Sequence, residues 1–439
     1  NSAAPSDTSS GYTKSDSKDN SSNDNQNNSK DNKVLELTSY TEPIIIENIE
    51  DIEPQCLEQA VHLSNLPFVY KWVSLMPDTH TGKGMPIGAV IACEDAVIPN
   101  AVGVDIGCGM AFVQTDIPAK LLRETMTGSG ELIRNIIGSI LRAIPVGFSH
   151  YSKPQPSAVL DNALEQADRY SPDKELFNNI NEGYFQVGTL GGGNHFIEIQ
   201  EDENGLACIM LHSGSRNFGY TVGKYFNSAA AKLNERWHSA VPPEYNLPFL
   251  PVSSVEGHQY LNWMHLSMDF AYENREAMLF KVKNIFSEMC EKYLGKTPVY
   301  SNQINCHHNY AALENHFGKN VWVHRKGAVR AEAGKSVIIP GAMGSYSYIA
   351  NGLGKDESFQ SSSHGAGRMY SRTAARQTFS VENVMVDLKN LGVVLGKHNK
   401  SDVADESRFA YKDIGKVMSN QQDLAQPVKK LFTIGVVKG

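Results

Sequence analysis

Five short segments of this sequence combine glycine with side chains that ligate metals, and a sixth has the ligands without glycine. The glycine-rich segments are residues 76–88, 102–110, 188–199, 210–219 and 361–368, and the sixth is 305–310. Glycine lets a backbone approach a ligand closely and adopt positive φ, but it weakens ordered structure. This density of glycine beside His, Asp and Cys therefore predicts a functional site built from these segments.

The strongest candidates for metal ligands are a carboxylate and a thiolate three residues apart. Asp105 and Cys108 lie on a glycine-rich turn, His195 and His212 stand at the ends of strand-like runs, and His308 adds a third imidazole. Oxygen, sulfur and imidazole together suit Mn²⁺, Fe²⁺, Co²⁺ or Zn²⁺, and a thiolate can bridge two metal ions. Taken singly, Cys108 could be an inert buried thiol and each histidine a structural group. Their occurrence in separate glycine-rich segments favours a shared metal site.

A different chemistry is indicated by His364. It lies between Ser363 and two glycines, and Arg368 follows four residues later. An exposed histidine with this clearance can attack phosphorus, and arginine offers a fork for phosphate oxygens. Further basic residues predict an anion-binding surface, and a solvated charged face is the alternative. They are Arg216, Arg325, Lys326, Arg330, Arg372 and Arg376.

Three common nucleotide-binding motifs are absent. There is no GxxxxGK[ST] phosphate loop, since THTGKG at 79–84 resembles one only superficially, and no Lys-x-Asp-Gly of lysine-adenylating ligases. The run GTLGGGN at 188–194 is not a GxGxxG fingerprint. A bound nucleotide would therefore need a different scaffold.

Composition limits the fold and the partners. The 439 residues are 41% hydrophobic, which excludes a wholly disordered protein, and the net charge of −8 excludes a general attraction for nucleic acid. No apolar run approaches the ~20 residues of a membrane helix, and we see no signal peptide. Six scattered cysteines without a CxxC pair indicate a reducing compartment, so we expect a cytoplasmic protein.

These residues must be positioned by helices and strands, and the sequence pattern predicts an α+β fold with mixed β-sheets and flanking helices. Residues 1–33 are Ser-, Asn-, Asp- and Lys-rich and predict a disordered, low-complexity tail, and the composition is globular over 34–439. Strands are expected at 44–49, 88–93 and 96–99, helices at 57–66, 131–143, 222–237 and 258–293, a surface excursion at 153–181, and alternating strands and turns at 321–350.

With these residues in place, the sequence resembles the RtcB family of 3′-phosphate RNA ligases from about Val34 to Gly439. The matching motifs occur in order: VGVDIGCGM, LGGGNHFIE, LHSGSR, NCHHNY, RKGAV, IPGAMG, SHGAGR and the final VVKG. The resemblance implies one large catalytic domain, 34–439, with an RtcB-like fold. It also implies an enzyme that joins RNA 3′-phosphate or 2′,3′-cyclic phosphate ends to 5′-hydroxyl ends. The reaction would pass through a guanylylated histidine and an RNA 3′ end activated with GMP, in tRNA splicing or RNA repair.

The resemblance also implies cofactors and residue roles. Two Mn²⁺ ions would be held, one by Asp105, Cys108 and His195 and the other by Cys108, His212 and His308, with GTP as co-substrate. His364 would carry GMP, with Arg216, Lys326 and Arg372 near the reacting phosphates. Contacts to the nucleotide would come from Asn194, Glu198, His308, Asn309, Pro340, Gly341, Ala342, Met343, Ser347, His364, Gly365, Ala366, Gly367, Tyr411 and Lys438. Ala342 departs from the family, which often has serine there.

The implied partners are RNA with broken ends, either tRNA halves or nuclease-cleaved RNA, together with GTP; an accessory activating protein is a further candidate, and no membrane is expected. One alternative is a dinuclear metal-dependent phosphodiesterase or phosphatase that acts on RNA ends without a covalent nucleotide. It explains the metal ligands but not SHGAGR and VVKG. Another is an inactive RNA-binding relative, which the intact candidate ligands oppose.

Overall fold

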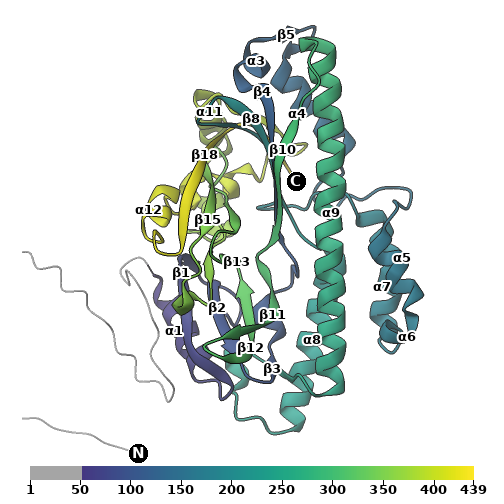
Figure 1. Cartoon of the computed structure of the whole chain (residues 1–439), viewed down its shortest axis with the longest axis vertical. Helices are drawn as coiled ribbons and strands as arrows, with labels where there is room; N and C mark the ends of the chain where they lie inside the picture. The colour runs from purple at the N-terminus through teal and green to yellow at the C-terminus, as the bar shows by residue number, and fades with distance from the viewer. Residues whose placement is uncertain (1–51) are drawn as a thin grey trace, which may run out of the picture. The chain divides into compact units, whose positions relative to one another are not determined.

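The computed structural model describes residues 52–439, which belong to one compact unit. The predictions for the tail at 1–33 and the strand at 44–49 lie outside the described residues. Within that part of the chain, helices surround mixed β-sheets (Figure 1), so the predicted α+β class is confirmed.

The larger sheet has eight strands in the order β10-β4-β8-β7-β18-β15-β14, with β17 beside β18. All the pairings are antiparallel except that of β17 with β18. The strands are β4 (Gly109–Pro118), β7 (Phe196–Asp202), β8 (Leu206–Ser213), β10 (Tyr300–His307), β14 (Ser336–Ile339), β15 (Tyr346–Gly352), β17 (Val394–Gly396) and β18 (Ala425–Lys438). Gly109 pairs with both Ser213 and His307, so the segments at these strand ends meet at one edge of the sheet.

A second, four-stranded sheet has the order β1-β2-β12-β11. Its strands are β1 (Val69–His80), β2 (Ile87–Cys93), β11 (Asn309–His316) and β12 (Lys319–Lys326). Three two-stranded sheets pair β13 (Ala328–Arg330) with β16 (Ser361–Ser363), β3 (Ala96–Val97) with β9 (Leu250–Pro251), and β5 (Met126–Thr127) with β6 (Gly130–Glu131). Because β10 is followed almost directly by β11, the two larger sheets are joined next to His308.

The helices pack around these sheets, and the longest, α9 (Val255–Leu294), runs beside both of them (Figure 1). Ser254 caps its first turn by accepting from the Gly257 N–H, and Gly295 ends it in the left-handed conformation. The other α-helices are α1 (Pro54–Ser64), α2 (Pro99–Val102), α3 (Ala119–Glu124), α4 (Leu132–Ala143), α5 (Ala158–Glu165), α6 (Ala167–Tyr170), α7 (Lys174–Gln186), α8 (Arg216–Arg236), α10 (Arg372–Thr378), α11 (Val381–Asn390) and α12 (Ile414–Ser419). None of the helices in the described range combines the length and apolarity needed to cross a membrane.

Most predicted elements are confirmed with shifted ends. The apolar stripe of α4 is buried as its 3.6-residue period requires. The predicted strand at 96–99 ends at Val97, because Pro99 occupies the first turn of α2, a position that suits proline. The predicted helix at 222–237 begins earlier, at Arg216, directly after the turn that follows His212.

The predicted surface excursion at 153–181 is only partly correct: many of its residues are exposed, but the segment is helical and packs on the core. This segment forms α5, α6 and the first part of α7, which lie beside α9 (Figure 1). Leu160, Leu176 and Ile180 are fully buried and share a core cluster with residues of α8 and α9. The segment is mostly polar, but a few large apolar residues are spaced as on one face of a helix. Burial of those residues against the core stabilises the helices.

Candidate functional site

The Cys108 thiol lies at the centre of the predicted metal ligands. Its Sγ is 3.4 Å from His195 Nε2 and 3.3 Å from His212 Nε2. His195 Nε2 is 3.1 Å from Asp105 Oδ2, and His212 Nε2 is 3.3 Å from His308 Nε2. Two groups of candidate ligands, each with atoms within 4.8 Å of one another, share this sulfur. The geometry therefore suits two ions with a bridging thiolate.

Two glycines allow the ligand side chains to approach. A Cβ at Gly214 would overlap the carboxylate of Asp105, and a Cβ at Gly191 would overlap the ring of His195. The Ser215 N–H donates to Asp105 Oδ1 at 3.2 Å, so the start of α8 also holds this carboxylate. Close packing against candidate ligand side chains thus explains these two glycines.

Burial sets the charge states of these ligands. Burial lowers the pKa values of His212 and His308 well below the usual range, which keeps both imidazoles in the neutral, metal-binding form. Burial opposes ionisation of Asp105, but the hydrogen bond and charge of His195 hold the pKa of that carboxyl below its usual value. Burial and the Asp105 charge raise the pKa of the Cys108 thiol, so a bound cation would be needed to hold its thiolate. The donor set and its convergent Nε2 atoms fit a pair of divalent cations.

Arg275 of α9 was not predicted, although it organises this cluster. It is fully buried, and its Nη1 donates to the carbonyls of Gly107 at 2.8 Å and Ser213 at 3.0 Å, next to Cys108 and His212. Its Nη2 lies 3.0 Å from Nδ1 of His307, so His307 points away from the metal ligands as expected for an extended run.

His364 lies beside the metal ligands, with its ring centroid 4.8 Å from that of His308. Its Nδ1 is 2.7 Å from Oδ2 of Asp78, which also accepts from the His364 and Gly365 N–H groups at 3.1 and 3.2 Å. Burial disfavours the Asp78 carboxylate, but His364 holds its pKa below the usual value. An ionised Asp78 accepts the Nδ1 proton of His364, so Nε2 is the ring nitrogen that can present a lone pair. Asp78 lies in the predicted segment 76–88 but was not singled out.

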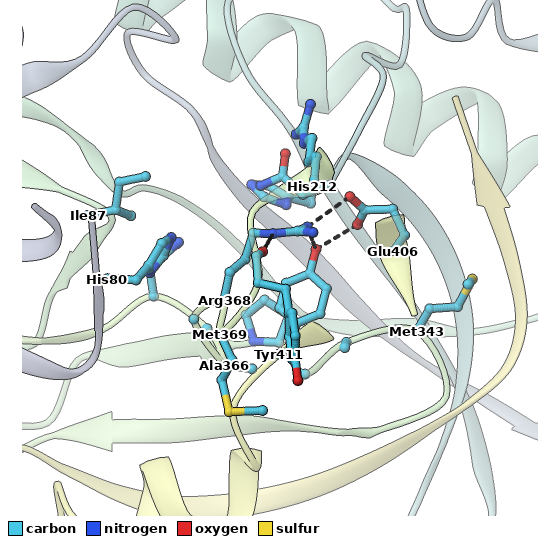
Figure 2. Close-up of a pocket in the computed structure, with 18 of the residues that line it drawn as sticks. His80, Ile87, His212, Met343, Ala366, Arg368, Met369, Glu406 and Tyr411 are labelled. Carbon is cyan, nitrogen blue, oxygen red and sulfur yellow. Dashed lines mark hydrogen bonds and ion pairs between the residues drawn. The ribbon is translucent and has the colours of Figure 1, made fainter. Parts of the chain in front are cut away.

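A cavity of about 530 Å³ opens beside His364. Figure 2 shows part of its lining, including His212, Met343, Arg368 and Tyr411. Predicted site residues on its wall are Asn194, Glu198, His212, Pro340, Gly341, Ala342, Met343, His364, Gly365, Ala366, Gly367, Arg372, Tyr411 and Lys438. The volume lies within the range of small-ligand pockets.

Glu198 is a buried carboxyl on this wall. Gln200 Nε2 and Thr433 Oγ1 each donate to its Oε2 at 2.7 Å. Burial raises its pKa to about 7, although these two donors and Lys438 act in the opposite direction. Ser347 and Asn309 are not part of the wall: Ser347 Oγ accepts from the Gly341 N–H, and the Asn309 side chain bonds the backbone of Asp105 and Gly327.

An ion-pair network closes another side of the cavity (Figure 2). The Tyr411 hydroxyl donates to Glu406 at 2.6 Å and accepts from Arg368 at 2.8 Å, and Lys438 Nζ lies 3.1 Å from Glu406. Arg368 was expected to bind phosphate, but it also donates to the Asp405 carbonyl at 2.6 Å. Its donors are engaged within the protein, so it positions Tyr411 and Glu406. Sequence reasoning missed Glu406 because an isolated carboxylate has no motif.

The predicted basic surface is only partly correct. Arg325 is fully buried and pairs with Glu314 through Nη1 at 2.6 Å and Nη2 at 3.0 Å, so it cannot bind an anion at the surface. Arg330 pairs with Glu332, and Arg376 pairs with Asp405 at 3.0 Å. Of the six basic residues, Arg372 lines the cavity.

The other two basic candidates, Arg216 and Lys326, are not on the cavity wall and donate to protein oxygens. Arg216 donates to Thr189 Oγ1 at 3.0 Å and to the Gly147 carbonyl at 2.5 Å. Lys326 Nζ donates to the Lys83 and Met85 carbonyls at 2.7 and 2.9 Å, and burial lowers its pKa to about 7. Their roles near reacting phosphates stay predictions.

Comparison with known proteins matches nearly the whole described chain. A family model described as tRNA-splicing ligase RtcB matches residues 59–439. The RNA-splicing ligase RtcB of Escherichia coli K12 is 37% identical over 400 residues, covering 88% of this chain and 95% of that protein. The tRNA-splicing ligases RtcB of Thermococcus kodakarensis and Pyrobaculum aerophilum are 30% and 29% identical over 466 and 469 residues, each covering 91% of this chain and 94% of the relative. The matched range includes every residue of the metal cluster.

Proposed function

Because the chain belongs to the RtcB family of RNA-splicing ligases, we propose that it joins RNA 3′-phosphate or 2′,3′-cyclic phosphate ends to 5′-hydroxyl ends, with GTP as co-substrate and two Mn²⁺ ions. That the protein is an RNA ligase follows from the family. The proposal that RNA ends are joined with GTP and two metal ions rests mainly on one observation. An Asp78-anchored histidine faces both a nucleotide-sized cavity and a cluster of metal ligands.

The metal cofactor would be held by Asp105, Cys108 and His195 at one position and by Cys108, His212 and His308 at the other. Bound there, the two ions would polarise phosphate oxygens and offset the charge of an in-line displacement. Mn²⁺ accepts the mixed oxygen, nitrogen and sulfur donors of this set. Cys108, His195, His212 and His308 are buried, which limits the access of water to this region.

The covalent step is assigned to His364. Its Nε2 lone pair attacks the α-phosphorus of GTP, so an N–P bond forms while the bond to pyrophosphate breaks. The Asp78 carboxylate holds the Nδ1 proton and offsets the positive charge that develops on the ring. Water would first open a 2′,3′-cyclic phosphate to a 3′-phosphate. An oxygen of the RNA 3′-phosphate then attacks the phosphorus of the His364–GMP adduct and releases His364. The 5′-hydroxyl finally attacks the RNA 3′-phosphorus, loses its proton and displaces GMP to form the phosphodiester.

Nucleotide recognition is assigned to the cavity wall. The buried Glu198 can face the N–H edge of guanine, since its two protein hydrogen bonds both fall on Oε2. Lys438 and Tyr411 are held in place by Glu406. The absence of a serine hydroxyl at Ala342 would remove one hydrogen bond to the nucleotide and leave backbone contacts intact.

Dependence on GTP separates this proposal from a metal-dependent phosphodiesterase. With Mn²⁺ and a pair of RNAs carrying a 2′,3′-cyclic phosphate and a 5′-hydroxyl, we expect a joined product only when GTP is added. Denaturing gels of end-labelled RNA measure the product. Hydrolysis of the cyclic phosphate at the same rate with and without GTP, and no joining in either case, would favour the phosphodiesterase.

Replacing Cys108 should disrupt both metal positions, because both candidate ligand groups include its sulfur. We expect wild type to bind two Mn²⁺ ions per chain and Cys108→Ala to bind at most one, with ligation lost. Equilibrium dialysis with metal analysis measures the stoichiometry, and Cys208→Ala, a buried thiol outside both groups, is the matched control. Two ions bound by Cys108→Ala would contradict the bridging assignment.

We propose tRNA halves and nuclease-cut RNA as substrates. An accessory activating protein and a cytoplasmic location stay predictions; the second is supported by six cysteines that are all unpaired.

A further inference from the structure

The loop Gly147–Lys153, here called the rim loop, presents an aromatic ring to solvent beside the site. Phe148 is fully exposed, although a large apolar side chain in water is unfavourable. His150 and Lys153 of the same loop are also exposed. An aromatic face among basic side chains is the combination that binds single-stranded nucleic acid.

The rim loop is anchored rather than loosely attached. The Gly147 carbonyl accepts from Arg216 Nη2 at 2.5 Å, and the Tyr151 N–H donates to the Phe185 carbonyl at 3.0 Å. The Tyr151 hydroxyl donates to the Gly188 carbonyl at 3.1 Å and lies 2.9 Å from Lys281 Nζ. These bonds on both sides of Phe148 fix the backbone that presents its ring.

The rim loop also adjoins the wall of the cavity. A Cβ at Gly192 would lie 3.7 Å from Gly147 Cα, and a Cβ at Gly193 would overlap the guanidinium of Arg372. The next residue, Asn194, lines the cavity together with Arg372. Gly147, the residue before Phe148, therefore lies against the glycine run that leads to Asn194 on the cavity wall.

We propose that Phe148 stacks on a nucleobase next to the reacting end of the RNA and so positions that end over the site. This inference rests on the proposed function. A base is favoured over a protein partner because the neighbours of Phe148 in the rim loop are polar or basic, whereas a protein contact would need surrounding apolar surface. A base needs only a ring face and cations for its phosphates.

Fluorescence of 2-aminopurine, which falls when the base stacks, tests the contact directly. One RNA carries it at the 3′-phosphate terminus and another at the 5′-hydroxyl terminus, and each is titrated with the full chain in Mn²⁺ without GTP. We expect quenching of one of the two by wild type and Phe148→Tyr, but not by Phe148→Ala. The terminus that responds identifies which strand is stacked.

Ligation kinetics give the size of the effect. We expect Phe148→Ala to raise the KM for that RNA about 5- to 150-fold, with kcat much less affected. The matched control is Phe317→Ala, another exposed phenylalanine, in the turn between β11 and β12, which should leave KM unchanged. An abasic nucleotide at the stacked position should remove the difference between wild type and Phe148→Ala.

Several outcomes would overturn the inference. They are equal quenching by wild type and Phe148→Ala, an unchanged KM, an equal loss for normal and abasic RNA, or a change of oligomeric state in Phe148→Ala without an effect on RNA. If wild type itself shows no GTP-dependent joining, the proposed function fails instead, so the two failures are distinguishable.

Discussion

Replacing His364 with alanine is expected to abolish the transfer of GMP from GTP to the protein. Two other histidines line the cavity, but neither can serve as well. His212 Nε2 faces Cys108 and His308 among the metal ligands, and His80 Nδ1 is 2.9 Å from the Asp78 carbonyl in a buried setting. His364 alone among the three combines a place on the wall with a carboxylate on Nδ1.

The measurement uses GTP labelled at the α-phosphorus, with Mn²⁺ and without RNA. Wild type should retain label through a denaturing gel run under alkaline conditions, which preserve an N–P bond, and His364→Ala should retain none. His258→Ala, an exposed histidine of α9, is the matched control and should label like wild type. Label that persists in a folded His364→Ala protein would overturn the assignment of the nucleophile.

The Asp78→Asn variant is expected to transfer GMP on the order of 10⁴-fold more slowly than wild type, the scale seen when the equivalent carboxylate of a serine protease triad is replaced. Asparagine keeps the shape and can still accept from the three donors that face Asp78 Oδ2. It removes the negative charge that stabilises the ring as Nε2 attacks. The defect should therefore lie in the rate and not in the KM for GTP.

Single-turnover labelling at several GTP concentrations separates these two quantities. Asp413→Asn is a suitable control, because the Asp413 side chain caps α12 by accepting from the Lys416 N–H and should affect stability only. A labelling rate within tenfold of wild type in Asp78→Asn would show that Asp78 has only a structural role.

The cluster of candidate metal ligands could be predicted because their side chains are chemically distinctive and their glycine-rich surroundings are unusual. Asp78 and Glu406 could not, because a single carboxylate gains its role from partners remote in sequence. Arg325 was placed at the surface by its charge, whereas its pairing with Glu314 allows complete burial. The α+β class followed from local patterns, but the pairing order that brings Gly109, Ser213 and His307 together did not.

The segment 153–181 shows the limit of composition as a guide. Its polar residues face water on helices whose few apolar residues, such as Leu160 and Ile180, are buried in the core cluster shared with α8 and α9. Only the position of α9 reveals that those residues have a partner surface, and that position is set by tertiary packing.

The carboxylate that anchors His364 lies 286 positions before it in the chain. During synthesis, most of the polypeptide must therefore be made before Asp78 of β1 can meet His364. A nascent or clipped chain that lacks β1 would leave the His364 imidazole without its carboxylate. A chain that lacks the segment of His364 would leave the Asp78 carboxylate without the imidazole that it anchors. Under the role proposed for His364, an incomplete copy of the protein would transfer GMP poorly, and GMP transfer would report that both segments had assembled.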